Sequence, residues 1–504
     1  MTNLNKIIIS LALVTWVSNA LAEDQQTWID AGKAELEAAK QLQPNNGKAK
    51  NVILFIGDGM GVSTVTGSRI FEGQQRGVDG ERNQLAFEQL PYLGLSKTYS
   101  ANQQTPDSAP TMSAIVTGIK TNEGVIGLNQ NVTRTETNQT VISANATQTI
   151  LEKAEAHGLA TGIISTARVT HATPAATYAH IPNRDWENDA LLPAAATQSG
   201  VKDIAVQLLE QGKKAGGDGI EVVLGGGRKE FLPKTAADPE HKKKHGKRKD
   251  GRNLIEEYVA QHNAEYVWNQ QQFDAINPKK TKRLLGLFQP SHMHYEHDRA
   301  NDKAGEPSLA EMTSKAIDIL SQNNKGYFLA VEAARIDHAS HAGNAYRTFS
   351  ETAALSDAVK TAMSKVDMSN TLIIVTADHS HSLTLAGYPK RGNPILGKVV
   401  APEKTKPTLA EDNKPYTTVT FANGTGYHEH VVEPSDMRVG RVKDMSNVDT
   451  TDPDFHQEAL VPLAYETHAA EDVAIFAGGP KAHLFHGVHE QSYIYYVMED
   501  ALGF

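Results

Sequence analysis

A carboxylate and an imidazole stand four residues apart in the stretch YFLAVEAARIDHASHAG, from Tyr327 to Gly343. Four residues make about 6 Å of helical rise, so Asp337 and His341 would share one helix face and could bind one ion. Such a mixed nitrogen and oxygen pair suits zinc. Glu332 ends the apolar run that precedes them. A lone D-x-x-x-H pair also fits a solvated helix start, so the other candidate ligands must decide between the two interpretations.

Short apolar runs deliver further candidate ligands. The run from Asn51 to Ile56 ends beside Asp58, and the run from Thr371 to Thr376 leads into Asp378 and His379. Continuous apolar runs of this length are typical of parallel strands that are buried on both faces. In open α/β sheets, ligands bind beyond the carboxyl ends of the strands. Taken alone, however, the Gly-Asp-Gly around Asp58 is also common turn chemistry.

Clustered carboxylates at one sheet edge would require cations. The candidates at predicted strand ends or in adjoining turns are Asp58, Glu332, Asp337, Asp378, His341, His379 and His468. If the sheet collects them, carboxylates face one another away from water, which is costly unless the charge is paired or ligated. Imidazole with carboxylate suits zinc, whereas carboxylate, hydroxyl and water suit magnesium.

A serine with nucleophile potential follows a turn signal in TPDSAPTMSA. Ser108 precedes a small-residue helical run, and the N–H groups at a helix N-terminus attract phosphate. Ordinary helix capping by Asp107 or Ser108 would explain the same pattern. The later stretch HATPAATYAHIPNRDW supplies His171, Thr173 and Arg184. Taken singly, these three also fit a turn and a solvated arginine.

Apolar strands alternate with helical stretches along most of the chain. This alternation predicts an α/β fold with a doubly wound, mostly parallel central sheet flanked by helices. Between residues 387 and 450 the sequence becomes rich in Pro, Gly, Lys and Thr, which indicates an inserted lobe. The predicted core therefore comprises residues 23–386 and 451–504.

The first 22 residues have the pattern of a secretory signal peptide. Lys6 precedes an apolar core from Ile7 to Val17 and the small-residue site Ala20-Leu21-Ala22, so the mature chain is expected to begin near Glu23. That core is too short to span a bilayer, and no later run approaches 18 apolar residues, so no membrane anchor is expected. The chain has no cysteine and a formal net charge of −10. It must fold without disulfides, and nucleic-acid binding is not expected.

Six sequence blocks, in this order, resemble the signature blocks of the metal-dependent alkaline phosphatases. They are NVILFIGDGMGVST, PDSAPT, HATPAATYAHIPNR, VEAARIDHASHAG, VTADHSHS and ETHAAEDVAIFAGGPKAHLFHGVHEQ. The resemblance runs from about Asn51 to the C-terminus and is closer to the animal-type and related marine bacterial branch than to the enterobacterial type. It implies an alkaline phosphatase-like fold and a homodimer with a crown-like lobe, residues 387–450, at the interface. With the signal peptide, it implies a periplasmic or secreted enzyme.

The resemblance also implies a role for individual residues. Ser108 matches the nucleophile that becomes a phosphoserine, and Arg184 matches the arginine that clamps two phosphate oxygens. The implied ligand sets are Asp337, His341 and His468 for one zinc; Asp58, Asp378 and His379 for a second zinc; and Asp58, Thr173 and Glu332 for magnesium. The residues implied to support these from outside the ligand sets are Asp107, His171 and His338.

Two departures from the family pattern stand out. Pro110 replaces the small residue usual after the nucleophile, although proline is tolerated in a first helical turn. The positions that match a further calcium or magnesium site are Glu240, Phe288, Gln289 and Glu306. An amide at Gln289 stands where a carboxylate is expected, which argues against calcium there.

The implied activity is hydrolysis of phosphate monoesters to an alcohol and inorganic phosphate, which is both product and inhibitor, by two-zinc in-line displacement. A sulfatase or phosphodiesterase of the same superfamily is a rival. The chain lacks the Cys/Ser-x-Pro-x-Arg context of sulfatases, and Arg184 favours the dianionic end of a monoester. A secreted metal- or phosphate-binding protein is a second rival, which would bind metal without turnover.

Overall fold

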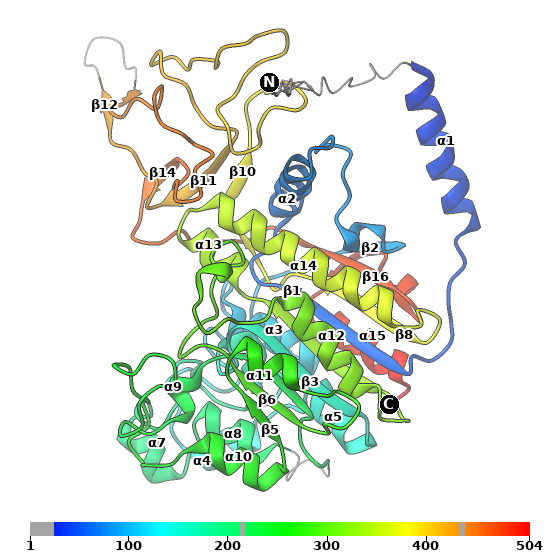
Figure 1. The fold of residues 1–504 in the computed structure, drawn as a ribbon, viewed down its shortest axis with the longest axis vertical. Coiled ribbons are helices and arrows are strands. Elements are labelled where there is room, and N and C mark those ends of the chain that lie inside the picture. Colours follow the sequence, from blue (N-terminus) through cyan, green and yellow to red (C-terminus); the bar gives the residue numbers. More distant parts are fainter. Residues whose placement is uncertain (1–24, 212–216, 433–438) are drawn as a thin grey trace, which may run out of the picture. The chain divides into compact units, whose positions relative to one another are not determined.

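The computed structural model describes residues 25–211, 217–432 and 439–504 (Figure 1). The chain divides after Gln43 into two compact units. In the first, Gln25–Gln41 form helix α1, as the Ala- and Glu-rich spacing of this segment predicts. The predicted signal peptide, residues 1–22, lies outside the described residues. Within the described ranges, no helix has the length and apolar character needed to cross a membrane.

A ten-stranded sheet forms the centre of the second unit, in the order β17-β2-β16-β8-β1-β7-β3-β4-β6-β5. Every neighbouring pair is parallel except the two pairs made by β16, which runs antiparallel to β2 and β8. The strands are β1 (Asn51–Gly57), β2 (Tyr92–Lys97), β3 (Ala160–Arg168), β4 (Val222–Gly226), β5 (Glu265–Val267), β6 (Leu284–Leu287), β7 (Tyr327–Ala333), β8 (Thr371–Thr376), β16 (Val473–Gly478) and β17 (Gly487–Glu490). The predicted mostly parallel sheet is confirmed.

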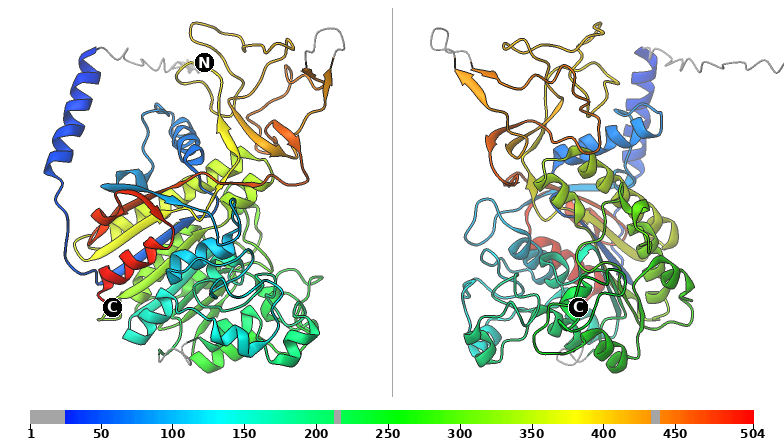
Figure 2. Two further views of the ribbon diagram at one scale, coloured as in Figure 1. Left: turned by 180° about the vertical axis from the view of Figure 1, so that it is seen from behind. Right: turned by 60° about the vertical axis from the view of Figure 1, so that its left-hand side comes forward.

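Helices cover both faces of this sheet because its central strands are apolar on both sides. In β1, Val52 and Leu54 belong to one core cluster, while Ile53 and Phe55 belong to the other. The helices that pack on the first face include α3 (Ser108–Thr117), α5 (Ile150–His157) and α15 (Tyr493–Leu502). Those on the second include α2 (Val62–Gln75), α12 (Leu309–Leu320) and α14 (Ala345–Lys365), and the two views show the opposite layers (Figures 1 and 2). This is the predicted doubly wound arrangement.

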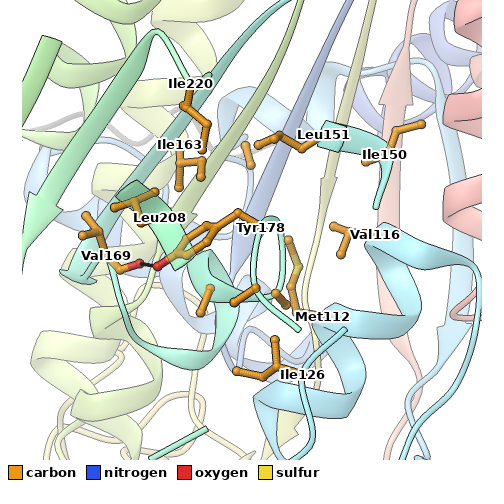
Figure 3. Packing of buried hydrophobic residues seen from close by; sticks show 14 of the residues in the cluster. Met112, Val116, Ile126, Ile150, Leu151, Ile163, Val169, Tyr178, Leu208 and Ile220 are labelled. Carbon is orange, nitrogen blue, oxygen red and sulfur yellow. Dashed lines mark hydrogen bonds between the residues drawn. The ribbon is translucent and has the colours of Figure 1, made fainter. Parts of the chain in front are cut away.

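Figure 3 shows how the first core cluster fixes α3 against the sheet. Met112 and Val116 of α3 lie in the same buried cluster as Ile163 of β3. Tyr178 is buried in this cluster and donates its hydroxyl hydrogen bond to the carbonyl oxygen of Val169, 2.9 Å away. The N-terminus of α3, which carries Ser108, is therefore held by close packing below it.

Shorter helices occupy the connections. They are α4 (Gln139–Ala144), α6 (Ala172–Ala175), α7 (Ala194–Ser199), α8 (Ile204–Glu210), α9 (Arg228–Phe231), α10 (Leu254–His262), α11 (Gln270–Ala275) and α13 (Arg335–His341). Helix α13 follows β7 almost directly, so the carboxyl end of a central strand leads straight into the predicted zinc-binding turn.

A smaller lobe follows β8 in the chain. It contains a three-stranded sheet of β10 (Leu383–Leu385), β11 (Val419–Gly424) and β14 (Ala459–Pro462) and a hairpin of β12 (His430–Val432) and β13 (Val439–Arg441). Apolar residues of this sheet pack with Phe71 of α2 and Phe349 of α14. Strands β10 and β14 lie outside residues 387–450, so the exact limits of the lobe stay a prediction.

Candidate active site

Three adjacent strands bring the predicted carboxylates to one edge of the sheet. Strand β1 lies between β7 and β8, and Ile56 of β1 is in register with Glu332 of β7. Asp58 follows β1 and Asp378 follows β8, so both stand just beyond the carboxyl ends of their strands. This is the position at which open α/β sheets bind ligands.

The first cluster of candidate ligands gathers around Asp337. The carboxylate oxygen Oδ1 of Asp337 lies 3.3 Å from Nε2 of His341 and 3.3 Å from Nε2 of His468. His468 lies in β15 (His468–Ala469), which pairs antiparallel with β9 (Ser380–His381). The Nδ1 atoms of His341 and His468 lie 2.5 Å and 2.7 Å from the main-chain oxygens of Glu466 and Pro106. Both imidazoles thus turn Nε2 toward Asp337, as metal ligands require.

His381 also belongs to this cluster, although its sequence context alone did not predict it as a ligand. Its donor atom lies within 4.8 Å of those of Asp337, His341 and His468. Its Nε2 lies 2.8 Å from Oδ1 of Asp337 and its Nδ1 lies 2.5 Å from Oε2 of Glu466. Because carboxylates occupy both ring nitrogens, His381 orients Asp337. The sequence feature that could have indicated His381 is its place as the second histidine of the ADHSHS block, two residues after His379.

The second cluster consists of Asp58, Asp378 and His379, and all three are buried. Nε2 of His379 lies 3.5 Å from Oδ1 of Asp58 and 3.2 Å from Oδ2 of Asp378. The backbone N–H of Gly59 donates to Oδ1 of Asp378. Oγ of Ser108 lies 3.1 Å from Nε2 of His379 and 3.5 Å from Oδ1 of Asp58. The predicted nucleophile therefore touches this cluster directly.

The predicted magnesium ligands form an oxygen-only group. One oxygen of each, Asp58 Oδ2, Thr173 Oγ1 and Glu332 Oε1, is buried without a hydrogen-bond partner among the described residues. Thr173 lies in α6, and Ser165 donates to the other oxygen of Glu332. Buried oxygens are rarely left unpaired, so these three fit a hard cation such as magnesium.

The two clusters hold their charges differently. Burial and the neighbouring carboxylates Asp378, Asp337 and Glu332 raise the pKa of Asp58 well above its ordinary value. Burial likewise raises the pKa of Asp378, and it raises the pKa of Glu332 to about 7. Burial would also raise the pKa of Asp337, but the surrounding histidines hold it well below its usual range. A bound cation would therefore favour the ionised form of the buried carboxylates around Asp58.

Asp107 connects the nucleophile to Arg184. Its carboxylate caps α3 by accepting from the N–H of Ala109 and also accepts from the N–H of Gly124. Nη1 of Arg184 donates to the same carboxylate at 2.9 Å. The guanidinium is therefore fixed beside the N-terminus of α3, and Pro110 fits within the first turn of that helix.

Three imidazoles gather beside the arginine, in edge-on and tilted arrangements. The ring of His171 lies 5.4 Å from that of His292 and 5.6 Å from that of His338, and the last two lie 4.2 Å apart. Nε2 of His171 lies 3.3 Å from Nη2 of Arg184. Burial lowers the pKa of His171 and lowers that of His338 to about 3, so both are neutral near pH 7. His292 was missed because nothing in its local sequence marks a site.

The four positions matched to a further calcium or magnesium site do not form a cation site. Nη1 of Arg228 donates to the carbonyl oxygen of Phe288 at 2.6 Å, and its Nη2 donates to Glu240 at 3.1 Å. A guanidinium thus takes two of the oxygens that a cation would need. Gln289 adds a neutral amide. These four residues do not fit calcium.

Comparison with known proteins agrees with this geometry. The family model described as alkaline phosphatase matches residues 49–504. The tissue-nonspecific alkaline phosphatase isozyme of Felis catus is 43% identical over 500 residues, which cover 97% of this chain and 91% of that protein. The alkaline phosphatase of Gadus morhua is 43% identical over 94% of this chain and 95% of its own.

Solved structures of similar fold include two from bacteria. The Thermus thermophilus alkaline phosphatase has a TM-score of 0.64 and 24% identity, over 94% of this chain and 95% of its own. The alkaline phosphatase of the Antarctic bacterium TAB5 has a TM-score of 0.59 and 21% identity, over 92% and 99%. At these identities the likeness is one of fold.

Proposed function

This chain belongs to the alkaline phosphatase family, on the side of its animal members, and on that premise we propose that it hydrolyses phosphate monoesters through a phosphoserine on Ser108. It is a phosphatase, and phosphate monoesters are its substrates. The observation that carries the finer proposal is the place of Ser108. Its Oγ contacts Asp58 and His379, and Ser108 begins α3, whose capping residue Asp107 holds Arg184.

We propose two zinc ions and one magnesium ion as cofactors. The mixed imidazole and carboxylate groups of Asp337, His341 and His468 and of Asp58, Asp378 and His379 suit zinc, and the oxygens of Asp58, Thr173 and Glu332 suit magnesium. Bound there, the ions would favour the ionised Ser108 and stabilise the charge of the leaving alcohol. Because several of these carboxyls have a raised pKa, metal binding should tighten as pH rises.

The proposed reaction has two in-line displacements. Ser108 Oγ gives up its proton and bonds to phosphorus, while the bond from phosphorus to the alcohol oxygen breaks and the alcohol takes a proton. A water then attacks the phosphoserine from the vacated side, and inorganic phosphate leaves as Ser108 recovers its hydroxyl. Through both steps Arg184 donates two N–H bonds to phosphate oxygens, held in that orientation by Asp107.

Replacement of the nucleophile tests this proposal. Ser108→Ala should abolish the acid-stable phosphoenzyme found by mass spectrometry and lower kcat by at least about 10³-fold, because it removes the hydroxyl that contacts both Asp58 and His379. Zinc and magnesium contents should stay unchanged. Ser113→Ala is the matched control, since Ser113 is also buried in α3 but bonds only to backbone atoms. Substantial turnover by Ser108→Ala would contradict the assignment.

Substrate comparison separates the rivals. Hydrolysis of p-nitrophenyl phosphate should exceed that of bis-p-nitrophenyl phosphate and p-nitrophenyl sulfate, because Arg184 is placed to bind a terminal dianion. A preference for the diester or the sulfate would support the rival enzymes. Bound metal without turnover of any of the three would support a binding protein.

We further propose export and dimerisation. Export rests on residues 1–22, and the N-terminal sequence of protein purified from the periplasm or medium should begin near Glu23. Dimerisation through the crown-like lobe is supported by exposed large apolar side chains in and beside it, among them Tyr388, Leu460 and Tyr465. Light scattering should give twice the chain mass, and a Tyr388→Lys and Leu460→Lys variant should shift it toward monomer.

A further inference from the structure

A second arginine, Arg134, lies beside the two backbone segments that hold Arg184 in place. The guanidinium of Arg184 is bonded to Asp107, and its main-chain N–H donates to the carbonyl oxygen of Gly124 at 2.8 Å. The N–H of Gly124 in turn donates to Asp107 at 3.1 Å. The position of Arg184 therefore depends on how the segment that contains Gly124 lies against its own segment.

The guanidinium of Arg134 links these two segments. Its Nη1 donates to Glu123, the residue before the glycine. Its Nε donates to Oδ1 of Asn183 at 3.3 Å, and its Nη2 donates to Oδ2 of Asp185 at 2.5 Å. Asn183 and Asp185 are the two chain neighbours of Arg184, so one side chain is bonded to the residues on both sides of it.

Close packing and a tight turn restrict the two segments further. Gly124 has a φ of +70°, and a Cβ added there would lie 2.6 Å from both Cδ and Nε of Arg134. Only glycine allows this backbone conformation together with so close an approach. In the other segment, Oδ1 of Asn183 also accepts from the N–H of Asp185 at 3.0 Å, which closes a turn around Arg184.

An ordinary surface ion pair would account for only part of this arrangement. The side chains of Arg134 and Asp185 are 32% and 68% exposed, so their attraction alone adds little stability. What distinguishes Arg134 is that each of its three acceptors belongs to a residue next to Gly124 or Arg184 in the chain. A planar guanidinium holds such acceptors in fixed directions, whereas a lysine ammonium is a point charge.

We propose that Arg134 is a positioning residue for phosphate binding, which holds Arg184 in the orientation that places its guanidinium on two phosphate oxygens. This inference rests on the role proposed above for Arg184. Part of catalysis comes from groups that are oriented before the reaction begins, so a small displacement of such a group lowers the rate. Without Arg134, the two segments can shift against each other, and phosphate binding must order Arg184 again.

A double-mutant cycle with Arg184 tests the proposal. Hydrolysis of p-nitrophenyl phosphate gives kcat and KM, and inhibition by inorganic phosphate gives Ki. We expect Arg134→Gln to raise Ki and to lower kcat/KM by about 10-fold each, and to have no further effect in the Arg184→Ala background. Arg134→Lys should fall between wild type and Arg134→Gln, because the ammonium keeps the charge but loses the planar fork.

Two further variants separate positioning from folding. Arg252→Gln is the matched control and should leave Ki and kcat/KM unchanged, because Arg252 also pairs with a carboxylate, that of Glu257, at a similar exposure of 38%. Asp185→Asn weakens one exposed partner of Arg134 and should change both constants in the same direction as Arg134→Gln, by about threefold. It gives the deciding measurement if circular dichroism shows that Arg134→Gln does not fold.

Two results would overturn this role of Arg134. The first is an unchanged Ki and kcat/KM in folded Arg134→Gln. The second is an equal loss of kcat/KM in the wild-type and Arg184→Ala backgrounds, since Arg134 would then act on the protein as a whole and not through Arg184. If Arg184→Ala itself binds phosphate and turns over substrate as the wild type does, the role proposed for Arg184 fails, and that of Arg134 fails with it.

Discussion

The Asp337 cluster and the Asp58 cluster stand at the same sheet edge but balance their charge in opposite ways. Asp337 faces three imidazoles, which hold its pKa low, and the rings of His341 and His468 remain 30% and 14% exposed. Asp58 shares its cluster with a second carboxylate and one imidazole, all nearly without exposure, and its pKa is raised. The first cluster is electrostatically satisfied by its own residues, and the second is not.

This difference gives the two pockets different dependence on metal. The Asp337 cluster keeps its shape through hydrogen bonds to Glu466 and Pro106. Because His341 and His468 are partly exposed, an ion bound there would have a path to solvent. The Asp58 cluster and the neighbouring magnesium group keep carboxylates together only against repulsion. A chelator should therefore remove zinc from the Asp337 pocket first.

The largest effect on activity is expected when the Asp58 cluster loses Asp58, the carboxylate that the proposed zinc and magnesium ions share. Asp58→Asn removes a ligand predicted for both zinc and magnesium, and kcat/KM should fall by at least about 10³-fold, or about 4 kcal/mol of transition-state stabilisation. Metal analysis should show loss of both ions from this side while one zinc remains. Asp357→Asn, on the exposed face of α14, should change neither quantity. If Asp58→Asn instead lost the zinc bound by Asp337, the Asp337 cluster would be the one that depends more on Asp58, contrary to the prediction.

A somewhat smaller effect is expected on the pH dependence of the stability of the metal-free protein when Glu332 is replaced. Because the folded pKa of Glu332 is raised to about 7, the native state holds this proton more tightly than the unfolded state does. The stability contributed by Glu332 is present below about pH 4.5 and is lost as pH rises through 7. In the metal-free state, Glu332→Gln should therefore gain stability relative to wild type across this window, by up to about 3 kcal/mol.

Denaturant unfolding of both proteins at pH 5 and pH 8 measures this difference. In the metal-loaded protein the variant should be less stable than wild type at pH 8, because a ligand is missing. An equal pH slope for the two metal-free proteins would show that Glu332 titrates normally.

The smallest effect on activity is expected from a change at the Asp337 cluster. His381→Gln removes the imidazole that orients Asp337, and zinc affinity should fall by about 10- to 100-fold. Excess zinc should restore most of the turnover, since Asp337, His341 and His468 remain. His486→Gln, an exposed histidine, provides the control. Failure of excess zinc to restore turnover would mean that His381 acts as more than a positioning residue.

The sequence was informative where local pattern and strand ends coincide. Asp58 and Asp378 could be placed because β1 and β8 are continuous apolar runs, which only a sheet buried on both faces accommodates. The i, i+4 pair of Asp337 and His341 followed from helix geometry, and the structure brings the pair together in α13. The mostly parallel sheet followed from the alternation of strands and helices.

Other parts depended on contacts that no local pattern reveals. His381 is placed beside Asp337 by the pairing of β9 with β15 and by its contact with the buried Glu466, which lies far along the chain. The misfit to calcium near Phe288 depends on the guanidinium of Arg228, which comes from helix α9.

The position of β16 has a consequence for the order of folding. This strand comes from the last part of the chain, yet it lies between β8 and β2 and joins β2 and β17 to the other seven strands. His468, on the same late segment, completes the Asp337 cluster. A chain interrupted before residue 468 would therefore have neither a continuous sheet nor a complete zinc pocket. During synthesis the enzyme should remain inactive until nearly its whole length is available, because these contacts between distant segments form last.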